Sequence, residues 1–206
     1  GMRTMLKAVT AEGLDKNTLV VFTSDNGPWT VFKEQGGSAG PLFAGKGTTW
    51  EGGMRVPTVF WAPGRIAPGI VNQIGSTLDL FHTFSTIAGV PLPKDRTLDS
   101  HDLGPLLFEK QKASRDHFLY YRGTQLYAAR LGAYKAHFIT QGEYGQFGDK
   151  KTHDPPLLYN LNRDPSEQFN IAETHPEVLK NIESLVTEHK KNMVPGPDQL
   201  KDRGVK

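Results

Sequence analysis

The chain has 206 residues, of which 37% are hydrophobic and 22% are charged, and its formal net charge is +2. This composition is typical of a globular protein with one or two domains and a sizeable core. The charge is too small to indicate binding to nucleic acid or to an anionic membrane, and no apolar run reaches membrane-spanning length. Cysteine is absent, which excludes disulfides, thiolate catalysis and zinc–thiolate sites within the chain and leaves its compartment open.

The first ninety residues show alternating helical and extended patterns. The apolar run 18–24 is rich in β-branched residues and nearly without alternation, which predicts a strand buried on both faces, as in a parallel sheet. Apolar spacing and capping residues predict the other elements. These are a helix from Met2 to about Gly13, a strand over 56–61, and a helix from Ser76 or Thr77 to Gly89.

The second half of the chain predicts a different architecture. Short apolar segments there are separated by turn residues rather than by helices, which favours an antiparallel sheet. The segments are 118–121, 126–130, 134–140 and 157–161, followed by a helix from Pro176 and an extended tail after Met193. Because prolines and turn formers fill residues 89–102, we expect a domain over residues 2–95 and a smaller α+β subdomain over 96–206.

The end of the first predicted strand carries a candidate metal site. Asp25 and Asn26 follow the run 18–24 directly. Ligands of open α/β sheets bind beyond the carboxyl ends of the strands, and carboxylate and carboxamide oxygens are the donors that Ca²⁺ or Mg²⁺ requires. The alternative is an ordinary turn, because Asp25-Asn26-Gly27-Pro28 is good turn chemistry without any ion.

Residues 28–55 form a glycine-rich segment without clear periodicity, which is too long for an ordinary connection. Its run 40–47 approaches a phosphate-binding loop, but Gly47 stands where Ser or Thr is required, so we reject that interpretation. Lys46 lies between Gly45 and Gly47, which let the backbone approach a ligand closely. Its ammonium group suits an oxyanion, although a solvated surface lysine is the alternative.

Several motifs in order resemble the sulfatase family, within the alkaline phosphatase superfamily. They extend over about residues 2–200, and Lys135–Phe138 and Tyr120–Gly123 are most similar to the arylsulfatase A and N-acetylgalactosamine-6-sulfatase branch. The remaining motifs are Asp25-Asn26-Gly27-Pro28, Gly45-Lys46-Gly47-Thr48-Thr49, Glu51–Pro57, Leu158-Tyr159-Asn160-Leu161 and Asp164-Pro165-Ser166-Glu167.

The resemblance implies a fold and a set of roles. The fold is an α/β alkaline-phosphatase-like sulfatase fold, here truncated at its N-terminus, with a C-terminal subdomain of a small antiparallel sheet and a helix. Asp25 and Asn26 correspond to two ligands of an active-site Ca²⁺, and Lys46 corresponds to a catalytic residue that contacts the sulfate. His137 resembles a histidine near the substrate pocket; a structural hydrogen bond is the alternative.

Two charged residues of the glycine-rich segment are expected to be structural. Charged side chains are rarely buried unless they are paired. We therefore expect Arg55 to be buried and paired, so that it holds the segment in place, and we assign Glu51 a structural role as well.

The resemblance also shows what this chain does not contain. Sulfatases use a formylglycine nucleophile made from Cys or Ser within Cys/Ser-X-Pro/Ala-X-Arg, and this chain has neither a cysteine nor a serine in that context. We therefore expect the C-terminal part of an enzyme that hydrolyses aryl or carbohydrate sulfate esters, N-acetylgalactosamine 6-sulfate among them. This chain alone is expected to be catalytically incomplete, with only part of the Ca²⁺ ligand set.

Two other functions remain open from the residues alone. One is a non-catalytic binding or assembly module, and the other is a fragment of a phosphoryl-transferring superfamily member. The expected partner is a sulfated small molecule or glycan, with no nucleic acid and no membrane. Self-association through the truncated sheet is also expected, because an isolated apolar strand exposes its edges and faces. Family members are commonly exported, so the parent enzyme is expected to be periplasmic or extracellular.

Overall fold

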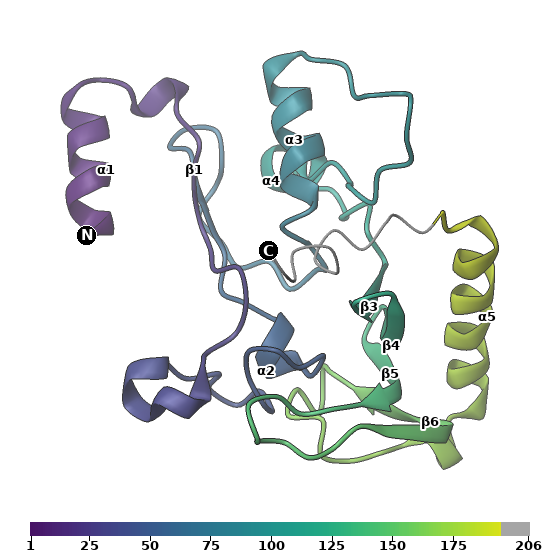
Figure 1. The fold of residues 1–206 in the computed structure, drawn as a ribbon. Helices are drawn as coiled ribbons and strands as arrows, with labels where there is room; N and C mark the ends of the chain where they lie inside the picture. The colour runs from purple at the N-terminus through teal and green to yellow at the C-terminus, as the bar shows by residue number, and fades with distance from the viewer. Residues whose placement is uncertain (195–206) are drawn as a thin grey trace, which may run out of the picture. The chain divides into compact units, whose positions relative to one another are not determined.

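The computed structural model describes residues 1–194 and divides the chain into two compact units. Unit 1 combines Gly1–Asp25 with Val56–Asp116, and unit 2 combines Asn26–Arg55 with the chain from His117 onward. The predicted domain boundary between residues 95 and 96 stays a prediction. In space, the segment 26–55 belongs with the C-terminal half of the chain, although it lies far from it in sequence (Figure 1).

Unit 1 contains the predicted N-terminal helices and strands. Gly89 ends the second helix in the left-handed conformation (φ 67°), and the amide of Val90 donates to the carbonyl of Ser85 at 2.9 Å, as a Schellman ending requires. A short helix, α4, was not predicted. The elements are α1 (Met2–Ala11), β1 (Val20–Phe22), β2 (Val59–Trp61), α3 (Asp79–Ala88) and α4 (Gly104–Glu109).

The predicted environment of the first strand is wrong. Within the described part of the chain, β1 pairs with β2 alone in a two-stranded sheet, and the pairing is antiparallel, with Val21 opposite Phe60. Neither strand is buried on both faces, and Phe22 is 52% exposed. An uninterrupted apolar run indicates that a strand has two faces suited to burial. It does not specify whether the neighbouring strand is parallel or antiparallel, because that direction is decided by the connection, here residues 23–58. Self-association through this sheet stays a prediction.

Unit 2 is built on the predicted antiparallel sheet, whose strands follow one another in the order β3-β4-β5-β6. β5 has the predicted bounds, whereas β6 begins six residues earlier than predicted. The strands are β3 (His117–Arg122), β4 (Gln125–Leu131), β5 (Tyr134–Thr140) and β6 (Lys151–Asn160). The predicted final helix is α5 (Pro176–Asn192), and the predicted extended tail lies largely outside the described residues.

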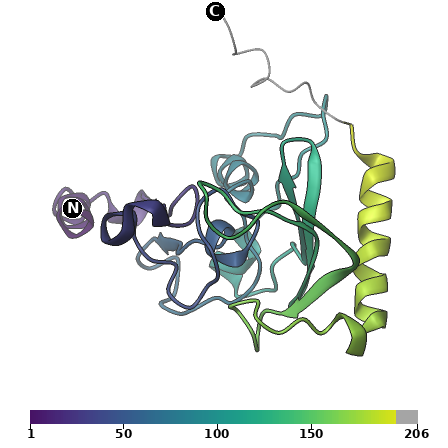
Figure 2. The ribbon, with the colours of Figure 1, turned by 60° about the horizontal axis from the view of Figure 1, so that its bottom comes forward.

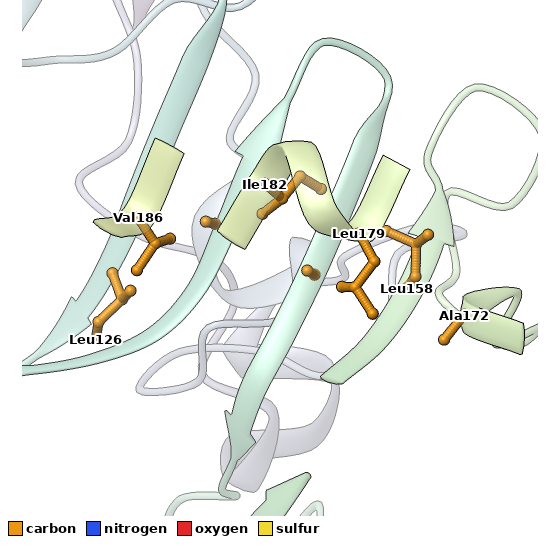
Figure 3. Close-up of a cluster of buried hydrophobic side chains, with 8 residues drawn as sticks. Leu126, Leu158, Ala172, Leu179, Ile182 and Val186 are labelled. Carbon is orange, nitrogen blue, oxygen red and sulfur yellow. The ribbon is translucent and has the colours of Figure 1, made fainter. Parts of the chain in front are cut away.

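One face of this sheet is covered by α5 (Figure 2). The helix places Leu179, Ile182 and Val186 on one side, at the spacing of an amphipathic helix, and all three are buried. They pack against small and branched side chains of the sheet, as Figure 3 shows. The sheet's contribution to this cluster is Leu126, Ala129, Ala136 and Leu158, with Ala172 from the connection to α5.

The other face of the sheet is covered by the glycine-rich segment 26–55. Ala44 and Trp50 of the segment form a second buried cluster with Tyr159 and Leu161. Since side chains alternate along a strand, neighbours on β5 face opposite layers: Ala136 faces α5, and Lys135 with His137 faces the segment. The segment itself contains a 3₁₀ stretch, Thr30–Gly36, and one short helix, α2 (Glu51–Met54).

No helix among residues 1–194 combines the length and the apolar character needed to cross a membrane.

Candidate active-site loop and its buried anchor

The segment 26–55 is held together by backbone hydrogen bonds rather than by regular structure. The amide of Gly27 donates to the carbonyl of Gly53, and the amide of Lys46 donates to the carbonyl of Pro28, both at 2.9 Å. A Cβ atom at Gly27 would lie 1.8 Å from the carbonyl oxygen of Gly52. The packing therefore requires glycine at position 27, and it fixes Lys46 beside the residues that follow Asn26.

Lys46 is half-buried and lies against an aromatic ring. Its Nζ is 4.8 Å from the centroid of the Trp29 ring, within cation–π range. The aromatic contact restricts the ammonium without neutralising it, so its positive charge stays available to an anion. The structure thus brings Lys46 and the Asn26–Pro28 segment together, as the sequence predicts for one site.

Asp25 and Asn26 are consecutive, but they end one unit and begin the next. Asp25 is exposed and Asn26 is half-buried. Among residues 1–194, no three histidine or acidic side chains are grouped so that they could hold a metal ion. The two oxygens suit a hard cation in kind, and they would be part of a larger ligand set. Their assignment as Ca²⁺ ligands stays a prediction.

A buried network of charged side chains, the anchor, lies between this loop and the sheet and consists of Glu51, Arg130, Lys135 and Glu167. The ammonium of Lys135 is 2.9 Å from Oε1 of Glu51 and 3.2 Å from Oε1 of Glu167, and the three side chains are at most 1% exposed. Arg130 approaches the other oxygen of Glu51 at 3.8 Å. Two carboxylates thus face two cations, so the group is neutral as a whole, as burial demands.

Glu167 connects the network to the backbone of the loop. Its Oε2 accepts a hydrogen bond of 2.6 Å from the amide of Glu51, at the first residue of α2. Its Oε1 accepts one of 2.7 Å from Nε2 of His137. Beside it, the hydroxyl of Ser166 donates to the carbonyl of Pro41. The turn 164–167 therefore holds the start of α2, five residues after Lys46.

The pKa values follow from burial and from these partners. Burial alone would lower the pKa of Lys135, but Glu167 and Glu51 outweigh it and raise that pKa above its usual value. Burial would raise the pKa of Glu167, whereas Lys135 and the hydrogen bond from His137 bring it below its usual value. The pair is therefore ionised over the whole physiological range.

His137 stays neutral in this environment. Burial is the main cause that lowers its pKa to about 4, and it outweighs the hydrogen bond to Glu167. Nε2 then donates its proton to Glu167, and Nδ1 is a buried acceptor without a hydrogen-bond partner among residues 1–194. The Trp50 ring covers the imidazole at 4.2 Å between centroids. The predicted substrate contact of His137 stays a prediction, and it would require the ring to leave this buried position.

The expectation for Arg55 is wrong: its side chain is exposed. Glu51 has the structural role that was predicted for it, and its partners come from the sheet. Lys135 and Glu167 were not predicted as members of the anchor. A signal was available, because a lysine at an inward position of an otherwise apolar strand requires a buried carboxylate.

Comparisons with known proteins agree with the motifs. The sulfatase family pattern matches residues 2–90, and the pattern described as the C-terminal region of aryl-sulfatase matches residues 113–205. Human arylsulfatase A is 42% identical over an alignment that covers 88% of this chain and 39% of that protein. Mouse N-acetylgalactosamine-6-sulfatase is 42% identical over an alignment that covers 91% of this chain and 41% of that protein.

Solved structures give the same result. The PsFucS1 sulfatase from Pseudoalteromonas sp. superposes with a TM-score of 0.84 at 28% identity, over 95% of this chain and 41% of that one. Ps i-CgsB in complex with k-i-k-neocarrahexaose superposes with a TM-score of 0.70 at 29% identity, over 90% of this chain and 38% of that one.

The chain spans about two fifths of the length of the curated relatives it matches. Its fold is the alkaline-phosphatase-like fold of sulfatases, which confirms the predicted fold class. The family patterns, the similarity to curated relatives and the superpositions lead to one conclusion: the chain belongs to the sulfatase family.

Proposed function

We propose that the protein containing this chain hydrolyses sulfate esters, and that Lys46 contacts the sulfate group during the reaction. The observation that carries this proposal is the position of Lys46. Its loop is locked by backbone hydrogen bonds to the segment that follows Asn26 and is anchored on the sheet through Glu51. A fixed cation of this kind stabilises negative charge that develops on a transferred sulfuryl group.

Asp25 and Asn26 are proposed to contribute two of the oxygens that bind an active-site Ca²⁺. A bound divalent cation would polarise an oxygen of the sulfuryl group. The donor types support this assignment, and the preference of Ca²⁺ for six to eight oxygens means that further ligands must complete the site. The family supports a metal cofactor in general, and the choice of calcium rests on the resemblance of Asp25 and Asn26 to calcium ligands of sulfatases together with the hardness of their oxygens.

The chain by itself is proposed to be inactive. It has no cysteine, and none of its serines lies in the motif from which sulfatases form their nucleophile. Positioned charges cannot by themselves carry out a covalent cycle that requires a nucleophile. Its contribution to the reaction is therefore to bind and orient the sulfate.

The relatives support a carbohydrate as the substrate class. One curated relative is named as a sulfatase of N-acetylgalactosamine 6-sulfate, and one structural relative was crystallised with a hexaose. We propose that the sulfate ester is carried by a sugar.

The test is an assay of the protein that contains this chain. We expect hydrolysis of aryl and sugar sulfates in preference to the corresponding phosphates. Lys46→Met should lower kcat/KM for sulfates at least a hundredfold, since one charge-stabilising donor contributes about 10²–10³ to the rate. Lys190→Met, which removes an exposed lysine of α5, is the matched control. A preference for phosphate esters would indicate a phosphoryl-transferring enzyme. Glycan binding without hydrolysis would indicate a binding module.

A further inference from the structure

A turn of unit 2 packs directly against the loop of Lys46. The connection between β5 and β6 folds back on itself at residues 143–146, where the amides of Glu143 and Gln146 donate to each other's carbonyl groups at 3.1 and 2.9 Å. A Cβ atom at Gly47 would lie 2.6 Å from Cγ of Glu143. The turn therefore rests on the residue that follows Lys46.

The turn presents a tyrosine in an unusual backbone conformation. Tyr144 has φ 53° and Gly145 has φ 74°, so both central residues are left-handed. A type I′ turn of this kind favours Asn, Asp or Gly at its first central position, because glycine has no Cβ atom and Asn and Asp tolerate the left-handed conformation better than other side chains do. A bulky residue in this position is an outlier that points to a use for its ring.

The Tyr144 ring lies beside the tryptophan that contacts Lys46. The centroids of Trp29 and Tyr144 are 5.4 Å apart, with the planes inclined at 49°. Both side chains are substantially exposed, Trp29 by 38% and Tyr144 by 47%. The two rings therefore form an accessible aromatic surface, which begins at the ammonium of Lys46.

Polar groups hold this surface in place. The hydroxyl of Thr30, next to Trp29, donates to Oε1 of Gln146 at 2.5 Å. On the other side of the turn, Arg122 forms an ion pair with Glu143 and donates to the carbonyl of Gly142 at 3.1 Å. Both ring-bearing segments are thus fixed before a ligand arrives, and preorganisation of this kind reduces the cost of binding.

We propose that Trp29 and Tyr144 form a subsite for the pyranose ring whose sulfate group Lys46 binds. The apolar C–H face of a sugar stacks on exposed aromatic rings, while its hydroxyl groups meet the amide of Gln146 and the charged pair of Glu143 and Arg122. The ammonium of Lys46 lies at one end of this aromatic surface and binds the sulfate group there. The ester bond then lies at the edge of the stacked sugar ring. This inference rests on the proposed sulfatase function and specifies its substrate class.

The experiment measures binding to this chain by saturation-transfer NMR and calorimetry. The probes are galactose 6-sulfate, phenyl sulfate and inorganic sulfate. The informative variant is Tyr144→Asn, because asparagine suits the left-handed turn position and removes the ring. Tyr144→Phe keeps the ring as the matched control, and Lys46→Met removes the cation.

We expect galactose 6-sulfate to bind more tightly than inorganic sulfate. Tyr144→Asn should weaken the sugar sulfate about fivefold, equivalent to ~1 kcal/mol, and leave inorganic sulfate within about 1.5-fold, since one aromatic contact is removed. Tyr144→Phe should bind galactose 6-sulfate within about twofold of the affinity of the parent chain. Lys46→Met should weaken the binding of both galactose 6-sulfate and inorganic sulfate.

The subsite would be disproved if the sugar sulfate and inorganic sulfate bound equally, or if Tyr144→Asn weakened both to the same extent. Tighter binding of phenyl sulfate than of galactose 6-sulfate, with the same dependence on Tyr144, would overturn the assignment to a sugar. Lys46→Met without effect on any sulfate would instead contradict the proposed function while leaving the aromatic subsite intact. The two proposals therefore fail in different ways.

Discussion

Removal of the Lys135 ammonium should destabilise unit 2 strongly. Lys135→Met keeps the length of the side chain and leaves two carboxylates, those of Glu51 and Glu167, buried without the cation that joins them. At separations near 3 Å and an effective dielectric constant of about 20, each contact contributes roughly 5–6 kcal/mol of Coulomb energy. Much of this is offset because the ammonium no longer has to be desolvated.

The net cost expected for Lys135→Met is about 3–5 kcal/mol, the range found when one partner of a buried ion pair is removed. The measurement is urea denaturation at pH 7.5, followed by circular dichroism. Lys190→Met, which alters an exposed lysine, should change the free energy of unfolding by less than about 0.5 kcal/mol. Because a cost of this size approaches the total stability of many domains, a milder variant is needed as well.

The milder variant is Glu51→Gln, which removes one negative charge and keeps the shape of the side chain. It should cost about 1.5–3 kcal/mol, the contribution of a hydrogen bond to a charged group. The double variant Lys135→Met with Glu51→Gln should cost at least ~1 kcal/mol less than the sum of the single variants, since the two side chains are in contact. Additive costs, or a loss below ~1 kcal/mol for Lys135→Met, would refute the idea of an anchor.

Three further predictions concern other parts of the structure. The pKa of His137 is lowered to about 4 in the folded chain, so the unfolded chain binds a proton at this histidine at higher pH than the folded chain does. As pH falls from 6.5 to 4, the parent chain should therefore lose about 3 kcal/mol of stability in urea denaturation, and His137→Gln should not show this loss. Gly52→Ala, whose Cβ would lie 2.3 Å from a carbonyl oxygen, should destabilise unit 2 in thermal melts by more than about 2 kcal/mol. Asp79→Asn breaks a buried pair with Arg115 and should cost about 3–5 kcal/mol in urea denaturation, whereas Asp95→Asn, in an exposed pair, should leave the denaturation midpoint almost unchanged.

The sequence predicts elements best where one local rule decides the structure. β5 was predicted with its observed bounds because a short apolar segment with turn residues on both sides is typical of a strand. The end of α3 at Gly89 was predicted because the left-handed position after a helix favours glycine. The direction of β1 was predicted wrongly, since it depends on a partner 41 residues away, as the pairing of Val20 with Trp61 shows.

The candidate site was only partly predictable for the same reason. Lys46 could be identified because small residues flank a cation and because the surrounding motif resembles that of sulfatases. The partners of Glu51 could not be identified, since Lys135 is 84 residues away and Glu167 is 116 residues away. Pairing over such distances is decided by which strand face the segment covers, and no local pattern specifies that face.

The buried anchor explains how a loop with little regular structure can hold a cation at a fixed position. The segment 26–55 has few internal hydrogen bonds of helix or strand type, so its order must come from tertiary contacts. Those contacts surround Lys46: Gly27 packs on α2, Glu51 is bound by Lys135 and Glu167, and Glu143 rests on Gly47. The C-terminal sheet therefore orients Lys46, the lysine proposed to bind sulfate, and we expect a weakened anchor to reduce sulfate binding although no direct ligand contact is proposed for Glu51, Lys135 or Glu167.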